Sequence, residues 1–186
     1  VLDHVTAALH WSEMIRSRMT FDLPPLWEEM IDLQPDDRRL HLGYALWFAE
    51  FTTEQLDLVQ QKFGFSVKLF SLLKDANKII RSIKHAKPQD PYGWALLLED
   101  ADPVAWYVAY RVSGCSEIEQ YVHKWRVIAP ITDGRALIDL GLRPGPAFQE
   151  LLAKVKRARL NGTILTNDQE IDFVRELVNE LRNQRE

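Results

Sequence analysis

Apolar residues recur along most of the chain at the three- and four-residue spacing of a helix, whereas alternating β-branched runs are absent. The stretch 69–83 shows this clearly. Its apolar helical face is formed by Leu69, Leu72, Leu73, Ala76, Ile79, Ile80 and Ile83. The pattern predicts an all-α fold of roughly nine to eleven helices, with an irregular helical body and a smaller helical tail.

Capping signals place the helix boundaries. Thr52 and Gln55 have the spacing of a capping box, Ser66 can cap a long helix, and two Asp-Pro pairs, at 90–91 and 102–103, are typical helix starts. We therefore expect helices over 1–19, 26–33, 36–51, 52–64, 66–85, 92–99, 103–112 and 116–127, then a short helix ending at 141, one over 146–160, and a last one from about 167 to the C-terminus.

The character of the chain changes after Pro130, where shorter turns replace the longer helical segments. This change predicts two domains, a helical body over 1–130 and a helical tail over 131–186. No apolar run has the length of a membrane-spanning helix, and the single Cys115 cannot form an internal disulfide. We expect a soluble, cytoplasmic protein without membrane contact. The chain begins without Met or a signal peptide, as a cut inside a longer polypeptide would.

Charge is distributed unevenly along a chain whose formal net charge is −4. Residues 62–87 carry 7 basic and 1 acidic side chains, and residues 143–160 carry 5 basic and 1 acidic. The acidic total therefore hides two basic segments, and both are candidate contacts for a polyanion.

The first basic segment carries Lys74, Lys78, Arg81 and His85 on one helical stripe, apart from the apolar face. Like charges at this spacing repel one another, so the arrangement has a small cost unless an anion lies against it. Nucleic-acid phosphate is such an anion. The alternative is a solvated face whose partners are acidic side chains of neighbouring helices.

The second basic segment begins with Pro-Gly-Pro. Pro146 suits a first helical position, Gly145 allows a close turn, and the backbone amides of residues 147–149 would form a phosphate site at the helix end. Arg143 precedes this end, and Lys154 and Arg157 share an exposed flank. An ordinary Pro-initiated helix with solvated lysines remains the alternative.

One stretch also resembles a known family. Residues 132–174 read TDGRALIDLGLRPGPAFQELLAKVKRARLNGTILTNDQEIDFV, and they resemble the C-terminal region of the bacterial-type (class II) tRNA nucleotidyltransferase and poly(A) polymerase family. Positions that match its motif are Gly134, Leu137, Ile138, Leu140, Gly141, Pro144, Gly145, Pro146, Leu152, Leu160, Gly162 and Glu170. Ala136 departs from the motif, because the family usually has Asp there. A weaker resemblance, to the family's body region, covers residues 39–68.

The resemblance implies that the catalytic chemistry lies elsewhere. Enzymes of this family add CMP and AMP, or AMP alone, to an RNA 3′ end with two metal-binding carboxylates in a head domain and a neck that selects the nucleotide. Mg²⁺ and ATP or CTP are therefore implied for the head, and no cofactor for this chain. Asp100 and Asp102 spell Asp-x-Asp, but no Gly-rich turn precedes them and Asp102-Pro103 is better read as a helix start. We expect no catalytic and no metal-ligating residues here, and inactivity of this chain alone.

Together these observations predict the body and tail of a tRNA nucleotidyltransferase-like enzyme, with the end of the neck as a candidate start of the body. Its partners would be tRNA or another structured RNA, and the parent's head and neck. The expected RNA contacts are Lys74, Lys78, Arg81, Arg143, Gly145, Lys154 and Arg157, on two basic helices that lie side by side. The alternative function is a helical scaffold that binds a partner protein or forms a homodimer without RNA.

Overall fold

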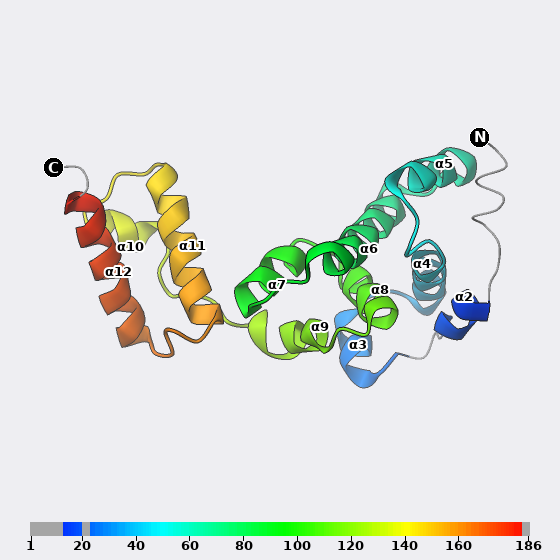
Figure 1. Ribbon diagram of the computed structural model, residues 1–186, viewed down its shortest axis with the longest axis horizontal. Coiled ribbons are helices and arrows are strands. Elements are labelled where there is room, and N and C mark those ends of the chain that lie inside the picture. Colours follow the sequence, from blue (N-terminus) through cyan, green and yellow to red (C-terminus); the bar gives the residue numbers. More distant parts are fainter. Residues whose placement is uncertain (1–12, 20–22, 184–186) are drawn as a thin grey trace. The chain divides into compact units, whose positions relative to one another are not determined.

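The computed structural model describes residues 13–19 and 23–183, and over these residues it is helical throughout, with no strand (Figure 1). The predicted all-α class is confirmed. The helices are α2 (Glu13–Arg18), α3 (Pro25–Met30), α4 (Pro35–Trp47), α5 (Thr53–Phe63), α6 (Val67–Ala86), α7 (Pro91–Leu98), α8 (Pro103–Ser113), α9 (Ser116–Gln120), the π-helical turn η1 (Tyr121–Trp125), α10 (Gly134–Asp139), α11 (Pro146–Leu160) and α12 (Asn167–Asn183). No helix within the described ranges is long and apolar enough to cross a membrane.

The described residues form two compact units. Unit 1 runs to Pro88 and includes Leu97–Glu119, and unit 2 comprises Gln89–Leu96 and the described residues from Gln120 onward. The chain passes between the units at Pro88–Gln89, again inside α7, and a third time at the end of α9. The domain boundary that the sequence indicates near residue 130 stays a prediction.

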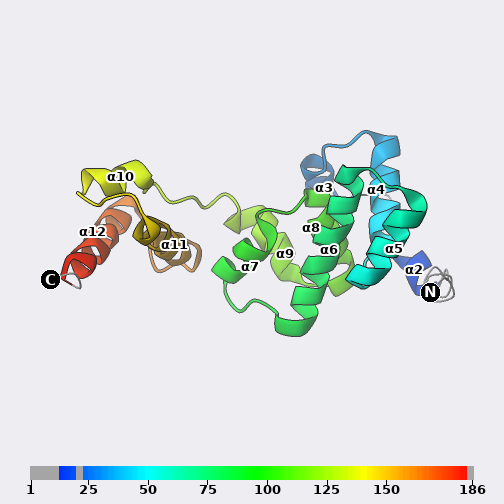
Figure 2. The same ribbon diagram turned by 90° about the horizontal axis from the view of Figure 1, so that it is seen from above.

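Unit 1 is built around α8, which packs against α6, α4 and α3, while α5 packs beside α6 (Figure 2). Fully buried side chains from these helices fill its core, including Trp27, Leu42, Leu46, Leu72, Ile80 and Tyr107. The apolar face predicted for α6 is the one that enters this core, because Leu69, Ile79 and Ile80 are all buried. Burial of that face leaves the polar stripe of α6 on the surface.

Several caps follow the sequence signals. The Thr52 hydroxyl accepts a hydrogen bond from Gln55 N at 3.3 Å, and the Gln55 side chain accepts one from Thr52 N at 2.8 Å, which completes the capping box. Ser66 Oγ accepts from Leu69 N at 3.2 Å at the start of α6. Asp102 accepts from Val104 N at 2.8 Å, so it is the cap of α8, as expected.

A buried asparagine anchors the chain just after α4. The helix stops at Trp47, four residues before the predicted end at 51. Asn77 Nδ2, from α6, donates to Phe48 O at 3.2 Å and to Ala49 O at 2.9 Å, and Phe48 O also accepts from Phe51 N at 3.0 Å. These carbonyls lie at the end of the helix, where no backbone amide of α4 can reach them. Asn77 therefore joins the end of α4 to the middle of α6.

Other boundaries also differ from the prediction, and the helix expected over 26–33 ends at Met30. The expected helix over 116–127 is α9 followed by η1, because Arg126 N bonds Tyr121 O at 3.0 Å, the five-residue spacing of a π turn. Arg126 Nε also donates to Val122 O at 2.7 Å and occupies a carbonyl of that turn. The helix expected over 1–19 is described only as α2, and residues 1–12 lie outside the described ranges.

Unit 2 has a core of its own between α10, α11 and α12. Its buried members are Leu137, Phe148, Leu151, Val155, Val174, Leu177 and Val178. Helices α11 and α12 pack side by side, with α10 against α11 (Figure 1). Phe148, Leu151 and Val155 form the buried face of α11, and Leu152 beside them is half-buried.

We predict that Asn77→Ala lowers the free energy of unfolding of unit 1 by about 2 kcal/mol, because Ala49 O loses the Asn77 donor and Phe48 O keeps only the N–H of Phe51. Urea denaturation followed by tryptophan fluorescence measures the loss. The control is Ser71→Ala, an exposed position on the same helix, which should change stability by less than about 0.5 kcal/mol. An Asn77→Ala variant as stable as this control would contradict the anchoring role of Asn77.

Candidate nucleic-acid interface

The basic stripe of α6 lines an open groove of about 610 Å³ beside α5. Lys74, Lys78, Arg81 and His85 all face this groove and are exposed. Arg81 Nη1 donates to Thr53 Oγ1 at 3.1 Å, which fixes the guanidinium against the start of α5. The structure thus brings together three of the predicted contact residues in one concave surface.

The groove contains one acidic side chain among its lining residues, Asp75. Burial raises the pKa of Asp75 above its ordinary value, while the positive charges of Lys78 and Lys74 act in the opposite direction. Three cations, Lys74, Lys78 and Arg81, face this one carboxyl group in the groove lining. The groove is therefore a cationic surface in an acidic chain.

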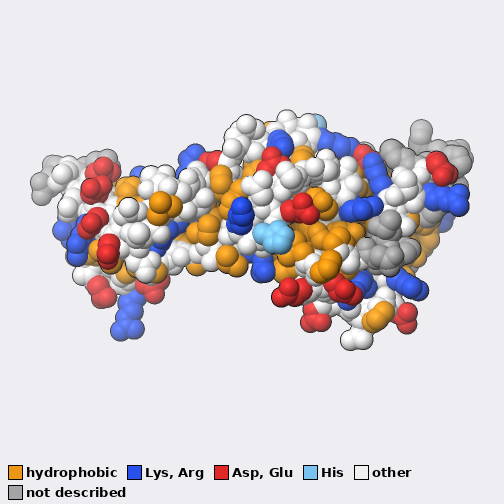
Figure 3. Space-filling model, turned by 90° about the horizontal axis from the view of Figure 1, so that it is seen from below, with side chains coloured by type: hydrophobic (Ala, Val, Ile, Leu, Met, Phe, Trp, Pro, Cys, Tyr) orange, Lys and Arg blue, Asp and Glu red, His pale blue; other side chains and the backbone are white. Residues whose placement is uncertain are grey.

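Some basic residues near the groove have carboxylate partners. Lys84 Nζ lies 2.5 Å from Glu50 Oε1, and Arg18 lies 2.6 Å from Glu50 Oε2. Hydrogen bonds from Lys84 and then from Arg18 hold the pKa of Glu50 below its ordinary value. Lys87 pairs with Glu117 at 2.7 Å. On the face drawn in Figure 3, Lys and Arg side chains lie dispersed among Asp and Glu side chains.

The start of α11 has only some of the features expected of a phosphate-binding site. Phe148 N donates to Gly145 O at 2.9 Å, so one of the three backbone amides expected to be free is used within the turn. Gly145 has extended backbone, φ 168°, which any residue adopts, and an added Cβ would meet no atom within 4 Å. Nothing in the described fold requires glycine here. Arg143, just before this end, is exposed.

Arg157, on the flank of α11, belongs to a polar cluster inside unit 2. Its Nη2 lies 3.4 Å from Asp90 Oδ2, and its guanidinium lies 5.9 Å from the centre of the Tyr92 ring. Asn161 Nδ2 also donates to Asp90, at 2.9 Å, and Asn161 Oδ1 accepts from Tyr92 N at 3.1 Å. The cluster ties the start of α7 to the end of α11, and it gives Arg157 an acidic neighbour.

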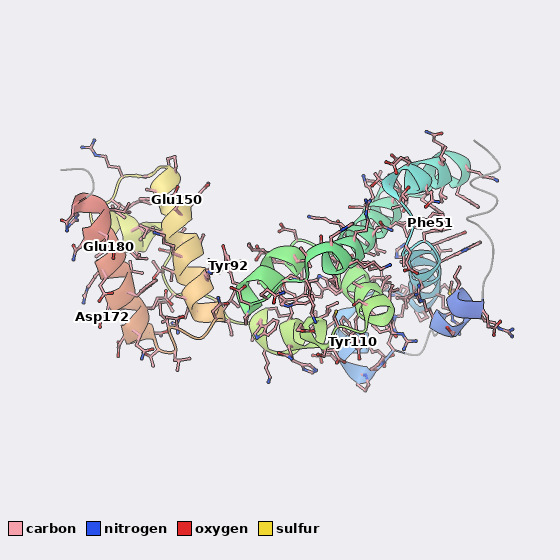
Figure 4. The ribbon with its side chains drawn as sticks, viewed as in Figure 1. Phe51, Tyr92, Tyr110, Glu150, Asp172 and Glu180 are labelled. Carbon is pink, nitrogen blue, oxygen red and sulfur yellow. The ribbon has the colours of Figure 1, made fainter. Side chains whose placement is uncertain are left out.

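Lys154 lies among acidic side chains as well. It is exposed, and it lines a small pocket together with Glu150 of α11 and Glu180 of α12 (Figure 4). Nearby carboxylates weaken the attraction of a lysine for phosphate. The flank of α11 is therefore a weaker candidate anion site than the groove on α6.

Glu170 is fully buried and connects three parts of unit 2. Its Oε1 accepts hydrogen bonds from Thr132 N at 2.7 Å and from Thr132 Oγ1 at 2.6 Å, and its Oε2 pairs with Arg159 Nε. Arg159 also donates to Asn167 Oδ1 at 2.6 Å. Arg159, a cation near the end of α11, is therefore occupied inside the protein. Together with Glu170 it connects the segment before α10, the end of α11 and the start of α12.

Burial acts to raise the pKa of Glu170, but the hydrogen bonds from Thr132 and Arg159 outweigh it and hold that pKa below its ordinary value. The sequence indicates Glu170 only as a match to the family motif, because a single Glu on an acidic helix carries no signal of burial. It likewise indicates Asp90 only as a helix cap, which it is: its Oδ1 accepts from Gly93 N at 2.7 Å.

The backbone conformation explains why glycine occupies two other positions of the family motif. Gly141 has φ 83°, in the left-handed region, and an added Cβ would lie 3.1 Å from Arg182 Nη2. Gly162 also has positive φ, 74°. Ala136, where the family usually has Asp, lines a shallow pocket of about 260 Å³ with Asp139 and Arg175.

The two basic helices belong to different units, α6 to unit 1 and α11 to unit 2. The expectation that they form one surface stays a prediction. Within the described ranges, no group of three or more His, Cys, Asp or Glu side chains is placed to hold a metal ion.

Comparison with known proteins supports a relationship to tRNA nucleotidyltransferases. An A-adding tRNA nucleotidyltransferase of Halalkalibacterium halodurans is 31% identical to this chain over 74 residues. The match covers 38% of this chain and 17% of that enzyme. No protein-family model matches the chain, and no solved structure matches it. The similarity covers a small part of that enzyme, and the A-adding activity belongs to the whole enzyme.

We predict that Glu170→Gln lowers the free energy of unfolding of unit 2 by about 3 kcal/mol at neutral pH, because the largely buried guanidinium of Arg159 loses its carboxylate partner. The sign of the pH dependence follows from the lowered pKa of Glu170. Its contribution is complete above the unfolded pKa of about 4.3 and is lost as the pH falls through the folded value.

Chemical denaturation between neutral and acidic pH measures this effect. The variant should lose the part of the acid sensitivity that comes from Glu170. Glu176→Gln, an exposed position on the same helix, should leave both stability and its pH dependence close to those of the unchanged chain. Equal stability of the two variants would mean that the buried network does not hold unit 2 together.

Proposed function

We propose that this chain is an RNA-positioning part of a tRNA nucleotidyltransferase-like enzyme, and that it holds structured RNA while a head domain elsewhere adds nucleotides to the RNA 3′ end. The observation that carries the proposal is the partial likeness to an A-adding tRNA nucleotidyltransferase. The resemblance of residues 132–174 to the C-terminal region of that family supports it.

The groove on α6 supplies the physical basis for binding. Phosphate oxygens in the groove would meet Lys74, Lys78 and Arg81 without displacing any of the carboxylate pairs formed by Lys84, Arg18 and Lys87. Such contacts recognise the position and shape of an RNA backbone and not its sequence. They would therefore orient the 3′ end and leave the choice of nucleotide to another domain.

In this proposal α11 contributes less than α6. Lys154 and Arg157 each have acidic neighbours, so they bind phosphate only by exchanging or sharing those neighbours. Arg143 and the end of α11 at Gly145 remain open to solvent and are the parts of the tail best placed to touch RNA. Mg²⁺ and ATP or CTP would bind to the head domain. The proposed cellular site is the cytoplasm, where tRNA is matured.

We predict that the affinity for tRNA falls steeply with salt, and that Lys74→Ala combined with Lys78→Ala reduces the slope of log K against log salt by about 2, because each lysine would neutralise one phosphate. Fluorescence anisotropy with labelled tRNA measures the slope. The control is Arg111→Ala, which removes an exposed cation from α8, outside the groove.

Two outcomes would contradict the proposal. One is an unchanged slope in the double variant. The other is a chain that binds no tRNA and self-associates independently of salt, which is the behaviour of the alternative, a helical scaffold or homodimer.

A second prediction concerns the start of α11. Gly145→Ala should leave the free energy of unfolding within about 0.5 kcal/mol of its original value, because the backbone there is extended and the space is open. It should nevertheless weaken tRNA binding several-fold, since a Cβ would keep an RNA phosphate away from the helix end. Thermal denaturation and anisotropy report the two effects separately. Unchanged tRNA affinity would exclude Gly145 from the interface.

A further inference from the structure

The turn between α5 and α6 exposes an aromatic ring in an ordered stack. The rings of Phe63 and Phe65 lie almost parallel, with an interplanar angle of 3° and centroids 5.6 Å apart. Phe65 is anchored in turn against Tyr44, with centroids 4.8 Å apart. Phe63 is the outer member of this stack and is 43% exposed. The stack thus ends in an aromatic ring at the surface.

The backbone holds this ring in place. Gly64 adopts the left-handed conformation, φ 61°, and its N–H donates to Gln60 O at 2.9 Å, which closes α5. The Gln60 side chain then donates to Phe65 O at 3.1 Å across the same turn. Phe63 is therefore presented on a fixed turn, and stacking on it would require little further ordering of the protein.

The charged side chains of the turn's own chain segment, between Asp57 and Asp75, are all basic. Residues 58–74 include Lys62, Lys68 and Lys74 and no acidic residue. Lys62 and Lys68 flank the aromatic turn and are both exposed. Val67, 88% exposed, begins α6 at the same turn, and the stripe of α6 continues from it toward the groove.

This combination fits one ligand chemistry better than others. A planar ring in an offset, near-parallel stack accepts another planar ring as its next layer, and every nucleobase has such a face. Two lysines beside the ring match the phosphates on either side of a base. An interfacial membrane helix would need a long apolar face, whereas the exposed large apolar residues of this turn are Phe63 and Val67.

We propose that Phe63 is a stacking site for an unpaired nucleobase of RNA, with Lys62 and Lys68 binding the phosphates on either side of it. The site deepens the proposed function, on which it rests, by adding a single-stranded segment to what this chain recognises. Stacking of this kind tolerates any base, so the site would bind an unpaired stretch without selecting its sequence.

The test uses the full chain and a fluorescein-labelled oligoadenylate of about 12 nucleotides, which has no paired structure to occupy the groove. Phe63→Leu keeps an apolar side chain and removes the ring, and it should weaken binding by roughly 5- to 100-fold with an unchanged salt slope. Phe63→Trp should restore the affinity. Lys62→Ala with Lys68→Ala should instead reduce the salt slope, by about 0.7 for each lysine.

Cross-linking provides a readout that folding alone does not affect. Irradiation of the complex with 5-iodouridine-substituted RNA should attach the base to Phe63, as located by mass spectrometry. Urea denaturation checks that Phe63→Leu is folded. The inference is overturned if Phe63→Leu binds the oligonucleotide like the unchanged chain, if Phe63→Trp is as weak as Phe63→Leu, or if no cross-link forms at the turn.

Two further arms separate this inference from other possibilities. If the chain binds tRNA with the expected salt slope but binds no oligoadenylate, the stacking site fails while the proposed function stands. If it binds vesicles of phosphatidylcholine and phosphatidylserine through Phe63 and shows no such dependence with RNA, the turn is a membrane contact and the stacking site is wrong.

Discussion

Burial of one face of α6 is the constraint on which the rest of the structure depends. Leu69, Leu72, Ile79 and Ile80 enter the core of unit 1, and Asn77 binds the carbonyls at the end of α4 from the same side. With that face committed, Lys74, Lys78 and Arg81 must share the opposite stripe, where they repel one another. Three cations thus share the groove beside α5 with one carboxyl group, Asp75, and in the proposed function an RNA phosphate there would lower their mutual repulsion.

The two units hold their helices with different buried polar groups. Unit 1 uses a neutral amide, Asn77, whereas unit 2 uses a carboxylate, Glu170, paired with Arg159 and hydrogen-bonded to Thr132. The pairing with Glu170 places Arg159 largely inside unit 2, so this cation of α11 is not free to bind phosphate. A count of basic residues therefore overstates the attraction of α11 for RNA, and on α6 it must leave out Lys84, which is paired with Glu50.

Sequence patterns predicted the helical class, the capping box at Thr52 and the buried face of α6, because these depend on residues close together in the chain. The anchoring of the chain after α4 was not predictable, since it depends on Asn77, which lies about thirty positions away and has no local signature. The pairing of Arg157 with Asp90 and of Arg159 with Glu170 was also not predictable, because exposed charges in a helical pattern do not reveal which distant carboxylates they meet. All seven proposed contact residues are exposed, yet only three of them share a groove.

Lysine acetylation footprinting tests the central claim most directly, because it reports which amines an RNA covers in the intact chain. Modification with and without tRNA, quantified by mass spectrometry, should show protection of Lys74 and Lys78, with little change at Lys84, whose ammonium group is already paired with Glu50. Full reactivity of Lys74 and Lys78 in a chain saturated with tRNA would contradict the role proposed for the groove.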